Sequence, residues 1–243
     1  MGISGLYHRQ TKGMKHLDRI AVLLIMLTTA ACGSTGAMVT EQAEERAARP
    51  STADLEALYW ARQDSALTKF TEADTHFMTG MIAHHAQALI MSELAPSNGA
   101  SPQVQTLAAR IINAQQDEID LMQQWLRDRG QPVPEVHITG INLMIHGAGD
   151  HAMHMHMPGM LSQEQLQELE AARGLDFDRL FLTYMIQHHA GAVYMVDELF
   201  STDGAALDEA AFKLASGIHV DQVTEIARME LMLEQLPDAG EDS

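Results

Sequence analysis

Apolar residues recur at intervals of three and four along most of the chain, the spacing that gathers side chains on one face of an α-helix. This pattern predicts four long helices, over about 72–95, 102–130, 176–200 and 207–236. A first amphipathic helix is expected over 53–70, and a short helix over 163–172. The segment 131–160 carries prolines at 132, 134 and 158 and is expected to be irregular.

Residue types at the predicted boundaries favour the same elements. Thr71 can cap the helix that follows it, with Asp74 at the third helical position as in a capping box. Ser101 is a capping residue, and the proline that follows it fits the first turn of a helix. Ser162 is expected to start the short helix, and Gly174 to end it.

The two halves of the chain repeat one another. Residues 81–88 have the sequence MIAHHAQA and residues 185–192 the sequence MIQHHAGA. The helix after each copy has the pattern Gln-x-x-Glu-Ile-x-x-Met, which begins at Gln115 and at Gln222. Two tandem helix-turn-helix repeats joined by a long crossover predict an all-α fold, a four-helix bundle with an extra N-terminal helix and a His/Met-rich crossover loop.

This organisation divides the chain into three regions. The expected regions are a signal peptide at 1–31, a lipidated cysteine with a flexible tether at 32–52, and the helical bundle at 53–243. The bundle comprises repeat 1 at about 70–130, the crossover at 131–174 and repeat 2 at about 175–236.

The N-terminal region has the order of a secretory signal, a basic segment followed by an apolar run that ends in small residues. The apolar run is too short for a comfortable membrane span. Cys32, the only cysteine, follows directly, and a signal that ends on a lone Cys resembles the lipobox of bacterial lipoproteins, although Thr29 stands where that pattern prefers Leu. The resemblance implies an exported protein held to a membrane by a lipid on Cys32, in the periplasm or on the outer cell surface. The alternative is cleavage after Ala31, which leaves a soluble protein with a free thiol.

The formal net charge of −18 argues against nucleic acid as a partner. So acidic a surface repels phosphate groups and attracts cations. A metal ion is therefore a more favourable partner for this chain than a nucleic acid is.

Thioether and imidazole side chains recur together in the two Met-His-His segments. The candidate metal ligands there are Met81, His84, His85, Met91, Met185, His188, His189 and Met195. This set favours Cu(I); imidazole also serves Cu(II), and zinc and silver are weaker matches. The residues expected to orient the imidazoles from the partner helices are Gln115, Glu118, Gln222 and Glu225. The alternative is structural, because Met commonly fills helix interfaces and a buried His is commonly a hydrogen-bonded core residue.

The end of the crossover is a second candidate site. It contains the histidines His146, His151, His154 and His156 and the methionines Met153, Met155, Met157 and Met160. Such His-rich tracts bind metals, so we expect ion capture here; the alternative is an exposed linker of accidental composition. The isolated His76 is a weaker candidate. It lies two turns before His84, a spacing that suggests the same helix face, but its counterpart in the second repeat is Leu180, so the two halves are not expected to be equivalent sites.

The paired Met-Ile-x-His-His segments, the Gln-x-x-Glu-Ile-x-x-Met helices and the sequence MPGML at 157–161 together resemble the DUF305 family. The resemblance covers about residues 70–236. It implies a ferritin-like four-helix bundle that is usually exported. Some members have been linked to periplasmic copper binding and copper tolerance. The thioether and imidazole side chains favour copper independently of this link.

Catalytic motifs are absent from the sequence. A di-iron oxidase needs Glu-x-x-His on two helices, and neither this motif nor His-Glu-x-x-His nor Gly-x-Ser-x-Gly occurs. We therefore expect a non-enzymatic, extracytoplasmic copper-binding protein that buffers or transfers metal or confers tolerance, and a homo-oligomer or a metal-transfer partner is left open. The alternative function is a helical interaction module of the cell envelope whose His-His stripes are structural.

Overall fold

The computed structural model describes residues 50–147 and 157–237. The signal peptide, Cys32 and nearly all of the tether lie outside these residues. The described elements are α2 (Thr52–Leu67), α3 (Glu72–Ser97), α4 (Pro102–Asp128), β1 (Glu135–Thr139), β2 (Asn142–His146), α6 (Gln163–Ala171), α7 (Gly174–Ser201) and α8 (Glu209–Glu234).

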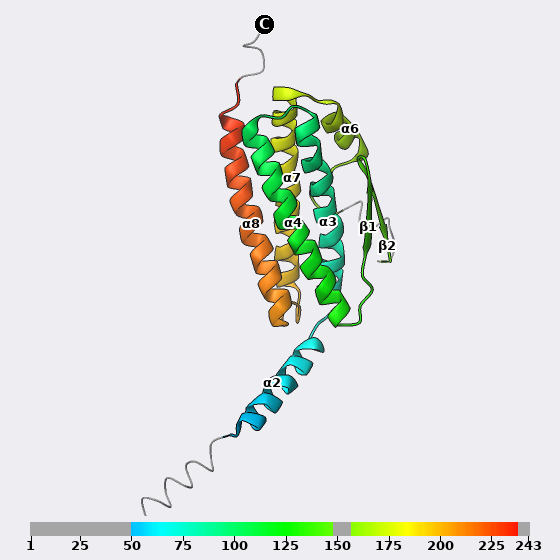
Figure 1. The fold of residues 1–243 in the computed structure, drawn as a ribbon, viewed down its shortest axis with the longest axis vertical. Helices are drawn as coiled ribbons and strands as arrows, with labels where there is room; N and C mark the ends of the chain where they lie inside the picture. The colour runs from blue at the N-terminus through cyan, green and yellow to red at the C-terminus, as the bar shows by residue number, and fades with distance from the viewer. Residues whose placement is uncertain (1–49, 148–156, 238–243) are drawn as a thin grey trace, which may run out of the picture. The chain divides into compact units, whose positions relative to one another are not determined.

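Four helices, α3, α4, α7 and α8, pack side by side as a bundle (Figure 1). Each predicted repeat is one helical pair, α3 with α4 and α7 with α8, and α3 also packs on α7. The mostly helical fold class is thereby confirmed. Helix α3 is the most enclosed, with every residue from Gly80 to Ser92 buried. Its sequence there is apolar or small on nearly all sides, as expected of a helix at the centre of a fold.

The predicted helix starts are found at three positions. Thr71 and Asp74 form the capping box of α3, in which the Asp74 carboxylate accepts from the Thr71 amide at 2.8 Å. Ser101 accepts from the Val104 amide at the start of α4, and Ser162 caps α6. Gly174 is the first residue of α7, so its predicted role as the end of α6 was wrong.

The crossover is more regular than predicted. β1 and β2 form an antiparallel hairpin with Glu135 opposite His146 and Thr139 opposite Asn142. Gly140, with φ of 58°, provides the tight turn between them. The prediction of an irregular segment was wrong because the three prolines dominated it, whereas the alternation of apolar and exposed residues along 136–145 is typical of a hairpin packed on one face.

Two buried aspartates connect the repeats. Asp74 on α3 accepts from the Ala206 amide, before α8, at 2.7 Å. Asp178 on α7 accepts from the Ser101 amide, before α4, at 3.1 and 3.2 Å. Each aspartate lies seven residues before the Met that opens its repeat motif, so the two contacts are equivalent under the internal repeat.

Helix α2 is present close to the predicted position. Its large apolar side chains at Leu55, Leu58, Tyr59 and Trp60 are exposed with respect to the described part of the chain. No helix in that part is both long and apolar enough to span a membrane.

Candidate metal-binding site

The Met-His-His segments of the two repeats meet where α3 packs on α7. The rings of His84 and His188 have centroids 3.9 Å apart and are tilted by 41°. His85 and His189 are as fully buried as these two. Neighbouring residues of a helix point about 100° apart. In each pair, therefore, the first histidine faces the other repeat and the second faces the partner helix of its own repeat.

Each second histidine is held by a glutamate. His85 Nε2 lies 2.7 Å from Glu118 Oε2 on α4, and His189 Nε2 lies 2.8 Å from Glu225 Oε2 on α8. A carboxylate accepts hydrogen bonds, so Nε2 of each ring is the protonated nitrogen and donates. The Nδ1 atom of a neutral ring then carries a lone pair.

His84 has the same tautomer for a different reason. Its Nε2 donates to the main-chain oxygen of Pro158 at 3.0 Å. His188 has no hydrogen-bond partner at either ring nitrogen among the described residues. The Nδ1 atoms of all four histidines are buried without such a partner in this part of the chain. Histidines that bind metal commonly donate the other ring N–H to a carboxylate or a main-chain carbonyl, as His84, His85 and His189 do.

Burial favours the neutral form of three of these imidazoles, those of His84, His188 and His189. It lowers the pKa of His84 from 6.5 to about 3, and the adjacent His85 adds to this effect. Burial likewise lowers the pKa of His188 well below 6.5, with His84 and His189 contributing. The pKa of His189 is also lowered by burial, although Glu225 acts in the opposite direction. A neutral ring can bind a metal ion, whereas a protonated one cannot.

The four buried histidines form a polar layer of the bundle, and two glutamines and an aspartate on α4 and α8 accompany them. Gln115 and Gln222 are buried, and the amide nitrogen and oxygen of Gln115 and the amide oxygen of Gln222 have no hydrogen-bond partner among the described residues. Burial, followed by Glu118 and Glu225, raises the pKa of Asp221. The sequence analysis missed Asp221, although its position four residues before Glu225 on α8 places both carboxylates on one helix face.

The methionines of the two segments lie in different surroundings. Met81, Met91 and Met185 are fully buried in the apolar core, while Met195 is partly buried at its edge. In the described part of the chain, no three side chains of the His, Cys, Asp or Glu types come together closely enough to hold a metal ion. A metal site in this layer would therefore need thioether ligands or a rearrangement of the side chains.

Of the candidate ligands in the crossover, three are described. His146 is exposed on β2, with its ring centroid 5.3 Å from that of His137. Met157 and Met160 are partly buried. The remaining candidates lie outside the described residues: His151, Met153, His154, Met155 and His156.

The segment 157–161 lies against the buried histidines. Besides the bond from His84 to Pro158, Gln87 accepts from the Leu161 amide at 2.7 Å and donates to the Leu161 oxygen at 3.1 Å. Gly159 and Gly191 bring this segment against α7, since a Cβ added to Gly191 would lie 2.0 Å from the Pro158 oxygen. This single segment contacts α3 through the side chain of Gln87 and α7 through the backbone at Gly191. The two repeats therefore need different residues at this position.

The sequence analysis missed Gln87 and Gly191 as functional positions. They occupy equivalent places in the two motifs and are among the few positions at which the motifs differ. That difference was the available signal. It marks the place where one repeat binds the crossover through a side chain and the other admits its backbone.

Solved structures resemble the chain over most of its length. A DUF305 fragment from Deinococcus radiodurans is 29% identical, with a TM-score of 0.56, and the match covers 69% of this chain and 99% of the fragment. A DUF305 protein from Streptomyces coelicolor, described as a candidate secreted protein, is 25% identical, with a TM-score of 0.55 and coverage of 67% and 91%. CopM in its Cu(II)-bound form is 29% identical, with a TM-score of 0.50 and coverage of 66% and 95%.

None of the curated proteins matches the chain. The model of the family DUF305, a domain of unknown function, matches residues 74–233. The resemblance drawn from the repeated motifs is therefore confirmed, and the chain belongs to the DUF305 family.

Proposed function

We propose that this chain is an exported copper-binding protein that buffers copper or hands it on outside the cytoplasm, held at the membrane by a lipid on Cys32. The observation that carries the proposal is the layer of four buried imidazoles. Each has an Nδ1 atom without a hydrogen-bond partner among the described residues, and three have their N–H group held by a carboxylate or a carbonyl.

A purely structural role accounts poorly for this layer. A buried polar atom without a hydrogen bond costs roughly 1–3 kcal/mol. Ten such side-chain atoms occur in the described part of the chain, and eight of them belong to the four histidines and two glutamines of this layer. Groups that remain unpaired at this density call for partners outside the described residues, and a bound ion is such a partner.

Copper fits the donor atoms better than a hard cation does. The candidate donors are imidazoles and thioethers in the two repeat segments and thioethers at 157–160, and no Lys or Arg lies within either motif. Thioethers select Cu(I), and imidazole serves both copper oxidation states. CopM, a relative with the same fold, has a Cu(II)-bound form, which supports copper as the ion.

Binding rather than catalysis is part of the proposal. The two glutamates of the layer each accept a hydrogen bond from a histidine N–H and so serve to orient a ring. A di-iron enzyme would instead direct its glutamates to the metal. The expected role is storage or transfer of the ion.

The test is titration of the chain with Cu(I), Cu(II) and Zn(II), beside two variants. One variant carries His84→Gln and His188→Gln, and the other has the five His and Met residues of 151–156 changed to Ser. We expect copper to bind to the wild-type chain more tightly than zinc, with affinity falling at least about tenfold in one variant. Loss in the first assigns the ion to the buried layer, and loss in the second assigns it to the crossover. No copper binding by the wild-type chain would contradict the proposal and favour the helical interaction module.

A further inference from the structure

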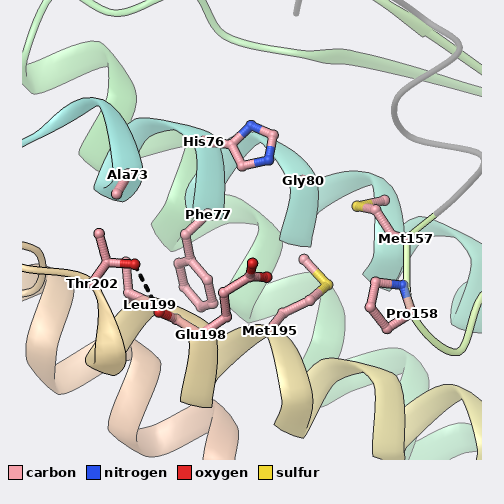
Figure 2. Close-up of a pocket in the computed structure, with 10 residues that line it drawn as sticks. All are labelled: Ala73, His76, Phe77, Gly80, Met157, Pro158, Met195, Glu198, Leu199 and Thr202. Carbon is pink, nitrogen blue, oxygen red and sulfur yellow. Dashed lines mark hydrogen bonds between the residues drawn. The ribbon is translucent and has the colours of Figure 1, made fainter.

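A cavity of about 310 Å³ lies beside the buried histidines, between the N-terminal half of α3 and the C-terminal half of α7 (Figure 2). His76 and Gly80 line it from α3, Met195 and Glu198 from α7, and Met157 from the crossover. Three segments that are distant in sequence therefore contribute to one opening. The sequence analysis had assigned Met157 and Met195 to separate sites.

Two thioethers converge on Gly80 in this cavity. A Cβ added to Gly80 would lie 3.1 Å from Met157 Sδ and 3.4 Å from Met195 Cε. The two methionine side chains therefore end at the same point of the α3 surface, which is open because Gly80 has no side chain. Figure 2 shows the end of each side chain beside this glycine.

The remaining polar groups of the cavity have the right chemistry for a cation. His76 is exposed, and its imidazole is a third donor of the kind that binds copper. Thr202 Oγ1 donates to the main-chain oxygen of Glu198 at 2.9 Å, and within the described residues no hydrogen bond or ion pair engages the Glu198 carboxylate. In Figure 2 this carboxylate extends from α7 into the space that faces α3.

We propose that this cavity is a capture site for a soft monovalent cation, Cu(I) in the cell, bound by the thioethers of Met157 and Met195 and the imidazole of His76. The carboxylate of Glu198 balances the charge of the ion. This inference rests on the proposed function and adds a second, accessible site to the buried layer. Cu(I) is expected to bind there more tightly than Cu(II), because two of the three donors are thioethers.

The cavity is also connected to the buried layer. Pro158, which follows Met157 directly, lines the cavity and accepts the hydrogen bond from His84. An ion held by Met157 is thus one residue away from the contact that fixes the first buried imidazole. A shift of this segment on binding would be transmitted to His84.

The experiment compares the full chain with the double variant Met157→Leu and Met195→Leu. Leucine has a similar volume to methionine and keeps the packing while removing both sulfur atoms. Met144→Leu is the matched control, because Met144 is an exposed methionine on β2 that does not line the cavity. His76→Gln tests the third donor, with His219→Gln as its control. Circular dichroism melts establish that each variant folds.

Cu(I) binding is measured by competition with a chromophoric chelator, and Ag(I), a soft ion that does not change oxidation state, is titrated in parallel. We expect the double variant to lose one Cu(I) and one Ag(I) equivalent, or to bind it at least about tenfold more weakly. His76→Gln should weaken the same equivalent, and the double variant should lose more affinity for Cu(I) than for Cu(II). Both controls should bind as the wild-type chain does.

The outcomes separate this site from the proposed function. If the wild-type chain binds Cu(I) and the double variant binds it equally well, the capture site is refuted and the copper-binding function stands. The same holds if Met144→Leu loses as much Cu(I) as the double variant. If the wild-type chain binds neither Cu(I) nor Cu(II), both proposals are refuted.

Discussion

One pair of equivalent residues, Gln87 and Gly191, shows how the repeats diverged around a shared site. Gln87 holds the main chain of Leu161 with two hydrogen bonds, and Gly191 admits the main chain of Pro158 and Gly159. A glutamine at 191 would collide with the crossover, and a glycine at 87 would leave Leu161 without partners. The asymmetry at this position follows from a single segment that crosses a symmetric pair of helices.

The variant Gly191→Ala tests this close approach. Its Cβ would lie 2.0 Å from the Pro158 oxygen and 2.4 Å from the Pro158 carbonyl carbon, and a backbone neighbour cannot rotate away. We expect the free energy of unfolding to fall by about 2–3 kcal/mol in urea denaturation. Gly217→Ala on α8 is the control, because nothing lies within 4 Å of its added Cβ, and the better helix propensity should stabilise the chain by about 1 kcal/mol. Equal effects at the two glycines would contradict the argument.

The lowered pKa values of the buried histidines predict acid sensitivity of the metal-free chain. His84, His188 and His189 titrate in the folded state below 6.5, the ordinary value at which they titrate when unfolded. Below pH 6.5 the unfolded state therefore binds more protons than the folded state, and stability falls as pH falls. For His84 this continues to about pH 3, with a slope of up to about 1.4 kcal/mol per pH unit. Asp221, whose pKa is raised by burial and by Glu118 and Glu225, opposes the trend at lower pH.

The measurement is the free energy of unfolding from pH 7.5 to pH 4.5, with a chelator present. His188→Gln removes one of the groups, so its stability should decline less steeply over this range than that of the wild-type chain. Parallel curves for the two proteins would show that His188 is not the source of the pH dependence.

Among the elements, the crossover joins the two candidate sites. Residues 157–161 bring Met157 to the cavity, Pro158 to His84 and Leu161 to Gln87. The hairpin, which precedes this segment in the chain, and α6, which follows it, both pack on α3. Residues 157–161 of the crossover therefore form a cover that packs against both α3 and α7, in addition to linking the repeats.

Gln87→Leu tests how firmly this cover is attached. The substitution removes both hydrogen bonds to Leu161, whose amide and carbonyl are buried and would be left without those partners. We expect a loss of about 2–4 kcal/mol in the free energy of unfolding. Gln116→Leu removes an exposed bond to Asp120 and should change stability by less than about 0.5 kcal/mol. A loss at Gln87 no larger than that at Gln116 would mean that the cover contributes little.

The helices of the bundle were predictable because their signals are local. Apolar spacing and the caps at Thr71, Ser101 and Ser162 lie within a few residues of the boundaries that they determine. The hairpin was missed, since its alternating residues are few and lie among prolines. The bond from His85 to Glu118 joins neighbouring helices of one repeat, so the equivalent motifs placed both residues on facing helices.

Features that depend on contact between the repeats were not predictable in this way. The approach of His84 to His188, the choice of Pro158 as the acceptor for His84 and the cavity of Figure 2 all require knowing how α3 crosses α7. Periodicity shows which face of a helix is apolar but not which residue of a distant helix lies opposite. His76 illustrates this limit: its spacing suggested the same face as His84, yet it is exposed and His84 is buried.

For the molecule as a whole, the hydrogen bonds of Asp74 and Asp178 to the backbone of the opposite repeat explain how two repeats form one fold. Each aspartate is buried on the first helix of its repeat and accepts from the backbone that precedes the second helix of the other repeat. The partners are 132 and 77 residues apart in sequence, so neither contact can form within a single repeat. These two hydrogen-bonded contacts therefore stabilise the assembled four-helix bundle and not the separate helical pairs α3–α4 and α7–α8.

Asp178→Ala should accordingly destabilise the whole bundle in one transition. It leaves the Ser101 amide, at the partly buried start of α4, without its acceptor, and loss of a hydrogen bond to a charged group with an orphaned partner predicts about 2–4 kcal/mol. Asp178→Asn, which keeps one acceptor oxygen, should recover part of this. Asp176→Ala, an exposed acid in the first turn of α7, is the control and should cost no more than about 1 kcal/mol. Unfolding is followed by circular dichroism and, in a Trp60→Phe background, by the fluorescence of Trp125, which lies on α4. If α4 melted at lower denaturant than the remaining helices in Asp178→Ala, the contact would be a local clasp on α4, and the two repeats would not depend on each other through it.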